Sequence, residues 1–117
     1  IACAVVSGYF YGYRESLLRM HWNCSCNYVP HLFETVDMGD IGALVAPRPL
    51  LIETGNRDEL NGESGLDNVL PQVSTARKAY GLLHAETALE HDIFEGGHRW
   101  HGKKAIPWLK RWLMDDA

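Results

Sequence analysis

Two loops of the sequence carry residue types that together could move a proton. The stretch "GNRDELNG", residues 55–62, contains Asp58, and the stretch "EGGHRWHG", residues 95–102, contains His98. A carboxylate that accepts a hydrogen bond from the Nδ1–H of a histidine fixes the tautomer of the ring and stabilises the imidazolium, so that Nε2 can take a proton from a nucleophile. Asp58 and His98 are therefore candidates for the acid and the base of a catalytic triad.

Other residues in or near these loops compete for the same roles. Glu53 and Glu59 are nearby carboxylates, and His101 is a second histidine in the later loop. An aspartate in a charged loop is usually a solvated turn residue, and a histidine at this place can instead cap the helix that follows. The residue types alone leave these alternatives open, although we expect His101 to begin the last helix.

The two loops can meet only if the strands before them lie in one sheet. Apolar stretches predict strands in "IACAVVSG", residues 1–8, and from about Leu50 to Gly55. A third strand candidate is "ALEHDIFEGG", residues 88–97, whose end is marked by two glycines. One loop follows the second strand and the other follows the third. Because the carboxyl ends of parallel strands meet at one edge of a sheet, we expect Asp58 and His98 to emerge on the same edge.

Helical spacing of apolar residues predicts two longer helices. The first begins at Asn68, carries Pro71 in its first turn, and places Val69, Val73, Ala76, Tyr80 and Leu83 on one side. The second runs from about Lys104 to Met114 and is expected to bury Ile106, Leu109 and Leu113. The order strand, excursion, strand, helix, strand, helix predicts an α/β fold, three-layered, with a mostly parallel sheet and flanking helices.

A loop-rich excursion, residues 9–44, separates the first two strands. Its pattern predicts short helices around Glu15–Trp22 and Pro30–Val36, and segments of this kind often cover a site. Its aromatic residues could line an acyl or sugar pocket, but packing beneath the excursion is the simpler interpretation; they are Tyr9, Phe10, Tyr11 and Tyr13. The same choice, sugar platform or core, applies to Trp100, Trp108 and Trp112.

The composition narrows the class of function. With 117 residues, of which 46% are hydrophobic and 22% charged, the chain is expected to form a single domain, residues 1–117, with a real core. Its net charge of -4 is spread along the chain, and no apolar run is long enough to span a membrane, so we expect neither nucleic acid nor membrane as a partner. A small or neutral ligand is favoured, and no localisation is predicted.

The three cysteines do not indicate a disulfide framework or a metal site. They are Cys3, Cys24 and Cys26, an odd number, and the C-x-C pair at positions 24 and 26 has no second pair of ligands near it in the sequence. We interpret them as small thiols and expect no metal and no cofactor.

Longer stretches around both loops resemble a known family. "APRPLLIETGNRD", "FEGGHRWHG" and "CNYVPHLFETVDMGDIGALVAPRPLL" look like the C-terminal half of an α/β-hydrolase, in the dienelactone hydrolase and acetyl xylan esterase-like branch. The resemblance implies a serine hydrolase acting on a small ester or an acylated carbohydrate, without a cofactor. The family orders its triad as Ser, then Asp or Glu, then His, and Asp58 precedes His98. The resemblance therefore assigns Asp58 as the orienting acid and His98 as the base.

The nucleophile of that family has no counterpart in the sequence. No G-x-S-x-G is present; "GESGL" at residues 62–66 lacks the last glycine and follows Asp58, and Ser7 in "VVSGY" lacks the first glycine. Cys24 or Cys26 could replace serine in principle, but neither has the right neighbours. Because the chain starts with Ile1 and not Met, we expect it to be a piece of something longer or a processed product. Because it lacks the nucleophile, we expect it to be a weak or inactive hydrolase alone.

A competing hypothesis is a non-catalytic module from a truncated reading frame. A half-sheet would leave its first strand as an unpaired apolar edge, which invites pairing with another copy of the chain. Under either hypothesis the isolated chain is expected to form a homo-oligomer.

Overall fold

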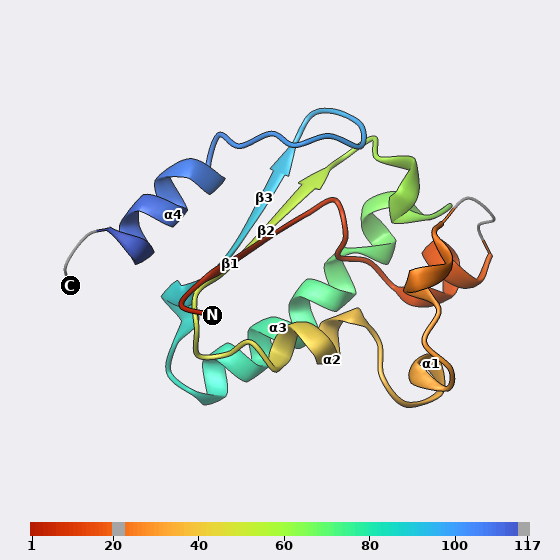
Figure 1. Ribbon diagram of the computed structural model, residues 1–117, viewed down its shortest axis with the longest axis horizontal. Helices are drawn as coiled ribbons and strands as arrows, with labels where there is room; N and C mark the ends of the chain where they lie inside the picture. Colours follow the sequence, from red (N-terminus) through yellow and green to blue (C-terminus); the bar gives the residue numbers. More distant parts are fainter. Residues whose placement is uncertain (20–22, 115–117) are drawn as a thin grey trace.

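A three-stranded parallel sheet forms the middle of the molecule (Figure 1). The structure is a computed structural model that describes residues 1–19 and 23–114. The strands are β1 (Ala4–Ser7), β2 (Leu50–Gly55) and β3 (Leu89–Phe94), and they lie side by side in that order. Strand β2 has the predicted bounds, and β3 lies within the predicted stretch 88–97. The parallel α/β architecture is confirmed.

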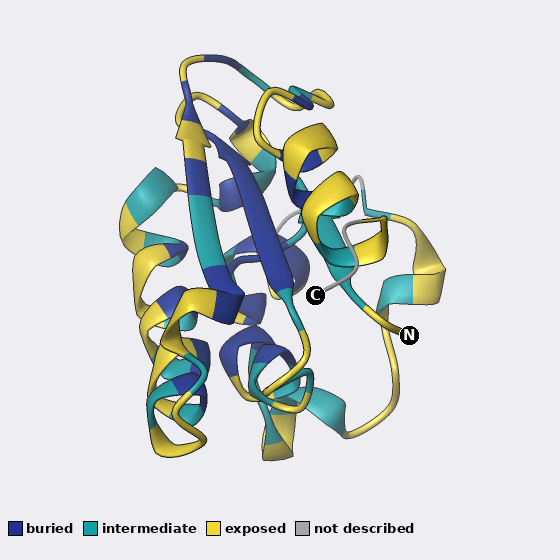
Figure 2. Ribbon diagram, turned by 90° about the vertical axis from the view of Figure 1, so that its left-hand side faces the viewer, coloured by how far each residue is buried: buried dark blue, intermediate teal, exposed yellow. Residues whose placement is uncertain are grey.

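Helices cover both faces of this sheet, so the fold has three layers. On one face lie α2 (Met38–Ala43) and α3 (Leu70–Leu82), and on the other lies α4 (Ala105–Leu113) (Figure 1). Every residue of β2 is buried, and the buried residues follow the strands and the inward sides of the helices (Figure 2). Since β2 pairs on both sides and is covered on both faces, its side chains alternate between the two layers.

The larger core lies between the sheet and the pair α2 and α3. Helix α3 begins beside Pro71, as predicted, and its buried positions include Val73, Ala76 and Tyr80. The prediction for Leu83 is wrong: this residue follows the end of the helix and is 53% exposed. Helix α2 crosses α3 closely at Gly39, where a Cβ atom would lie only 2.6 Å from the Gln72 carbonyl oxygen.

The smaller core lies under α4, and here the predicted stripe is wrong. Ile106 and Leu113 are 53% and 57% exposed, and Leu109 is only half-buried. The buried face is instead Ala105 and Trp108, which pack on Leu51 together with Trp112. Ala105 is small enough to let the helix approach the sheet, and the Trp108 ring buries more apolar area than an isoleucine could.

The excursion between β1 and β2 contains short helical segments. It holds a π-helical turn at Arg14–Leu18, a 3₁₀ turn at Ser25–Asn27 and the helix α1 (Leu32–Thr35), in addition to α2. The helix predicted around Pro30–Val36 therefore exists, while the end of the one predicted around Glu15–Trp22 falls on residues 20–22, outside the described part. Phe10, Tyr11 and Tyr13 are buried, which favours packing over an open pocket for these rings.

Within the described residues, no helix is both long enough and apolar enough to cross a lipid bilayer.

Candidate active site

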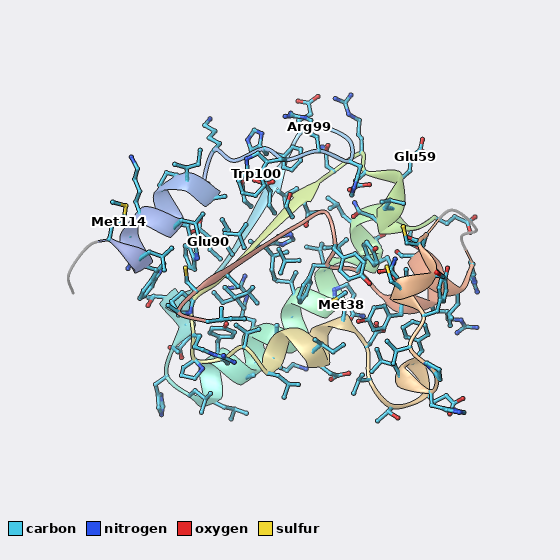
Figure 3. The ribbon with its side chains drawn as sticks, in the orientation of Figure 1. Met38, Glu59, Glu90, Arg99, Trp100 and Met114 are labelled. Atoms are coloured by element: carbon cyan, nitrogen blue, oxygen red, sulfur yellow. The ribbon has the colours of Figure 1, made fainter. Side chains whose placement is uncertain are left out.

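The Asp58 and His98 side chains meet at the carboxyl end of the sheet. His98 Nδ1 lies 2.8 Å from Asp58 Oδ2, a hydrogen-bond distance. The two residues come from loops that follow the adjacent strands β2 and β3, and their neighbours Glu59 and Arg99 mark these loops at the same end of the molecule in Figure 3. Placement of both side chains on one edge of the sheet is what the loop positions predicted; whether they are catalytic stays a prediction.

The two oxygens of the Asp58 carboxylate have different hydrogen-bond partners. Oδ1 accepts a hydrogen bond of 2.9 Å from the Leu60 N–H and so caps the 3₁₀ turn Glu59–Asn61. Oδ2 remains for the imidazole. The side chain of Asp58 is 1% exposed, whereas that of His98 is 55% exposed. The Asp58 carboxylate is thus held in place and shielded from water, whereas the His98 ring reaches solvent.

Backbone contacts hold the two loops against each other. The Asn56 N–H donates to the Phe94 carbonyl over 2.9 Å, and the Arg57 N–H donates to the Gly96 carbonyl over 2.8 Å. The Asn56 side chain accepts a further bond of 3.1 Å from the Gly96 N–H. These bonds continue the pairing of β2 with β3 past the strand ends, so the relative position of Asp58 and His98 follows from the sheet register.

Gly8, whose role the sequence alone does not indicate, faces the side chains of Asp58 and His98. Gly8, directly after β1, has a φ of +66°, and a Cβ atom there would lie 2.9 Å from His98 Cε1 and 3.4 Å from Asp58 Oδ2. Any side chain at this position would collide with the pair. The signal in the sequence is a Ser-Gly at the end of the first strand, which has no evident role until the strands are placed in order.

Glu53, one of the two competing carboxylates, and His101, the competing histidine, are engaged in other contacts. Glu53 is fully buried inside β2 and accepts hydrogen bonds from the Ser7 hydroxyl, the His101 N–H and the Gly102 N–H. Burial alone would raise the pKa of the Glu53 carboxyl, but these hydrogen bonds outweigh the burial and hold the pKa below its ordinary value. The His101 ring stacks on Phe94 with centroids 4.5 Å apart. The geometry therefore favours Asp58 and His98 over Glu53 and His101 as an acid–base pair.

Two cavities flank the imidazole. One, of about 410 Å³, is lined by Arg57, Asp58, Glu59, Leu60, Gly97 and His98. The other, of about 380 Å³, is lined by Ser7, Gly8, Tyr9, Tyr11, Asn23, Cys24, Cys26, Asn27, Leu60 and His98. The second cavity lies under the excursion, and the described part of its wall consists of phenol, amide, hydroxyl, thiol, aliphatic and imidazole groups. A neutral polar molecule fits this lining better than a charged one.

The two serine hydroxyls considered as nucleophiles are each bonded to a carboxylate. The Ser7 hydroxyl donates to Glu53 over 2.7 Å, and the Ser64 hydroxyl of "GESGL" donates to Glu15 over 2.8 Å. Cys24 and Cys26 are exposed free thiols at the wall of the second cavity. In the described part of the chain, no group of three or more His, Cys, Asp or Glu residues is arranged to hold a metal ion.

Comparisons with known proteins bear on the fold. No protein-family model matches the sequence, and no curated protein matches it either. Among solved structures, one assigned as an acetyl xylan esterase from Bacteroides fragilis NCTC 9343 superimposes with a TM-score of 0.70 at 15% sequence identity; the match covers 98% of this chain and 37% of that one. Methylesterase BT1017 matches with a TM-score of 0.50 at 15% identity, over 63% of this chain and 16% of its own. The chain therefore has the fold of part of an esterase domain, and it spans little more than a third of the first of these structures.

Proposed function

We propose that Asp58 and His98 are the acid and the base of a Ser-His-Asp triad, in the C-terminal part of an α/β-hydrolase that acts on carboxylic esters. The observation that carries the proposal is the 2.8 Å contact between a dry carboxylate and a solvent-facing imidazole at the carboxyl edge of a parallel sheet. The esterase fold of the structural neighbours and the order of Asp58 before His98 support it.

The geometry fits the proton transfers of ester hydrolysis. Asp58 accepts the Nδ1–H bond, which leaves Nε2 of His98 as an acceptor that takes the proton of a serine hydroxyl while its oxygen attacks the ester carbonyl carbon. The resulting imidazolium lies beside the Asp58 carboxylate and returns the proton to the leaving alcohol. Water then attacks the acyl-serine by the same exchange, with His98 again as base, and releases the carboxylic acid.

The serine of this scheme lies outside the printed sequence, which contains no G-x-S-x-G. We therefore propose that the 117-residue chain alone does not hydrolyse esters, and that its substrate in the complete enzyme is a small ester or an acylated carbohydrate. Among the described residues that line the 380 Å³ cavity beside His98 there is no carboxylate, lysine or arginine, which supports a neutral substrate.

The test compares the isolated chain with the polypeptide encoded by the reading frame extended upstream of Ile1. We expect a G-x-S-x-G in that extension, hydrolysis of p-nitrophenyl acetate by the longer polypeptide, and loss of at least about a thousandfold in kcat on His98→Ala. A Glu59→Gln variant is the control, because it removes an exposed carboxylate beside Asp58. Turnover that survives His98→Ala, or an extension without such a serine, would refute the triad.

Self-association of a non-catalytic module is the second candidate. In the described sheet β1 pairs only with β2, so its other edge is open, and Ile106 and Leu113 on α4 are also exposed. Pairing of two β1 edges in a symmetric dimer would cover the open strand. Light scattering coupled to size-exclusion chromatography should then report a dimer or larger species at micromolar concentration, and a monomer there would count against this candidate.

A further inference from the structure

We propose that Glu53 is a positioning residue that holds the His98 loop so that the imidazole meets Asp58. The inference rests on the proposed roles of Asp58 and His98. Glu53 lies in the middle strand, directly after the buried Leu51 and Ile52, and is itself fully buried. A carboxylate at such a place costs free energy unless its oxygens are well bonded, so its partners are the key to what it does.

The three donors to Glu53 come from both sides of the site. The Ser7 hydroxyl, at the end of β1, donates to Oε1 over 2.7 Å. The His101 N–H donates to Oε1 over 2.8 Å, and the Gly102 N–H donates to Oε2 over 2.7 Å. One carboxylate thus joins the end of the first strand to the segment that leads from the third strand into α4. Hydrogen bonds from backbone N–H groups to a charged oxygen are among the stronger ones in proteins.

These contacts enclose His98 within a short, doubly anchored span. On its N-terminal side the loop is fixed where the Gly96 carbonyl accepts from Arg57, and on its C-terminal side it is fixed where His101 and Gly102 donate to Glu53. Only residues 97–100 lie between the two anchors. Gly102 adopts a φ of +76°, a conformation that favours glycine, and a Cβ atom there would lie 2.6 Å from Trp100 Nε1.

Glu53 also fixes the wall on the opposite side of the imidazole. Ser7 directly precedes Gly8, whose backbone packs against the His98 ring, and the Gly8 N–H donates to the Glu53 carbonyl over 3.0 Å. The loop that carries the ring and the glycine that faces the ring are therefore both hydrogen-bonded to Glu53. Loss of the carboxylate should loosen the loop first, because two of its three donors belong to the loop.

The tautomer of His98 reports this positioning without any need for catalysis. In neutral imidazole the hydrogen bond at one nitrogen decides which nitrogen carries the proton, so a bond to Asp58 selects Nδ1–H. Long-range ¹H–¹⁵N correlation spectra of the isolated chain at pH 9 distinguish the two forms. We expect Nδ1–H for His98 in the wild type, and a fall of about tenfold or more in the ratio of Nδ1–H to Nε2–H in Glu53→Gln, because the two loop N–H groups bond to different carboxylate oxygens and the amide replaces one of these oxygens by an NH2 donor.

Control variants separate this inference from the function on which it rests. Glu90→Gln removes a carboxylate from the far end of β3, where Glu90 binds Lys104 (Figure 3), and should leave the His98 tautomer unchanged. Asp58→Asn should shift the tautomer directly. If Asp58→Asn shifts it and a folded Glu53→Gln does not, the positioning role is wrong and the acid–base pair stands. If the wild-type ring does not carry Nδ1–H, both are wrong.

A second pair of variants keeps the test decisive if Glu53→Gln does not fold. Glu53→Asp retains the charge but withdraws the carboxylate from the loop, and Ser7→Ala removes only the donor from β1. We expect the tautomer ratio to fall in Glu53→Asp and to change less in Ser7→Ala, since the two loop bonds remain there. Equal ratios in Glu53→Asp and the wild type would overturn the inference.

Discussion

Replacing Gly8 by alanine should disconnect His98 from Asp58 while the protein stays folded. The new Cβ atom would lie 2.9 Å from His98 Cε1 and 3.0 Å from His98 Nδ1. Non-bonded carbon atoms prefer separations of about 3.5 Å or more, so the ring must move by about 0.6 Å at least. His98 is half exposed and can turn outward, whereas Asp58 is buried, bonded to the Leu60 N–H and unable to follow.

The cost in stability that comes from the backbone of Gly8→Ala should be modest. Gly8 has a φ of +66°, and a residue with a Cβ atom loses about 1–2 kcal/mol in the left-handed region. The lower entropy of the unfolded alanine chain returns about 0.4–1 kcal/mol of this. The net loss is about 1 kcal/mol, roughly a fivefold change in the folding equilibrium. The lost hydrogen bond to His98 adds a further cost of about 1–3 kcal/mol, because it leaves Oδ2 of the buried Asp58 carboxylate without the imidazole.

Gly65 provides a matched control for this substitution. It has a φ of +57°, and a Cβ atom there would meet no atom within 4 Å. Urea denaturation should show a loss of about 1 kcal/mol in Gly65→Ala and a loss larger by about 1–3 kcal/mol in Gly8→Ala, which also breaks the hydrogen bond between His98 and Asp58. Only Gly8→Ala should convert His98 from Nδ1–H to a mixture of tautomers. An unchanged tautomer in Gly8→Ala, or the same change in Gly65→Ala, would refute the proposed contact between Gly8 and the pair.

Three further predictions concern stability. Burial, and then the charge of Arg77, lowers the pKa of His91 from 6.5 to about 4. The unfolded chain takes up a proton on His91 at a higher pH than the folded protein does. The stability that neutral His91 contributes is therefore complete above pH 6.5 and is lost as the pH falls toward 4. Solvent screening leaves about 1–2 kcal/mol of it, which pH-dependent urea denaturation should show in the wild type and not in His91→Gln. The pKa of Glu53 is lowered, so its contribution is present above pH 4.5 and is lost as the pH falls further through the folded value, and the same titration of Glu53→Gln should lack that loss. Trp108→Ala should cost about 3–5 kcal/mol and Ile106→Ala less than about 0.5 kcal/mol; equal costs by urea denaturation would contradict the orientation of α4.

The strands and the meeting of the two loops could be predicted from the sequence because each depends on a strong, local pattern. Leu50–Gly55 is a short, mostly apolar run that ends at a glycine, which is typical of a strand buried on both faces, and Leu89–Phe94 is a short stretch of mixed polarity that ends just before two glycines. Once two parallel strands are placed side by side, the loops after them must share an edge. The 2.8 Å contact between Asp58 and His98 is a consequence of that topology.

The buried face of α4 could not be predicted because two apolar stripes have the same period. Ile106, Leu109 and Leu113 recur at helical spacing, and so do Ala105, Trp108 and Trp112, one residue out of phase. Periodicity cannot choose between stripes that differ only in phase. The choice depends on the sheet, where Leu51 offers a surface that a small residue beside a large ring can fill.

The supporting residues of the site were missed for a different reason. Gly8 and Glu53 act on parts of the chain that are 90 and 48 residues away, at His98 and His101, and nothing near either residue in the sequence signals the contact. Glu53 is visible in the sequence as a charged residue in a mostly apolar strand, but its residue type alone makes it only a rival to Asp58. The partners that define its role appear only when β1 and the β3 loop are placed on the two sides of β2.

The contact between Asp58 and His98 is therefore assembled entirely from elements of this chain. The register of β2 and β3 sets the separation of the two loops, the Leu60 N–H holds Asp58, and the anchors at Gly96 and Glu53 hold the span that contains His98. None of these contacts involves a nucleophile. If the triad proposal is right, the tautomer of His98 is fixed before a serine arrives, so that the cost of orienting the base belongs to folding and not to the reaction.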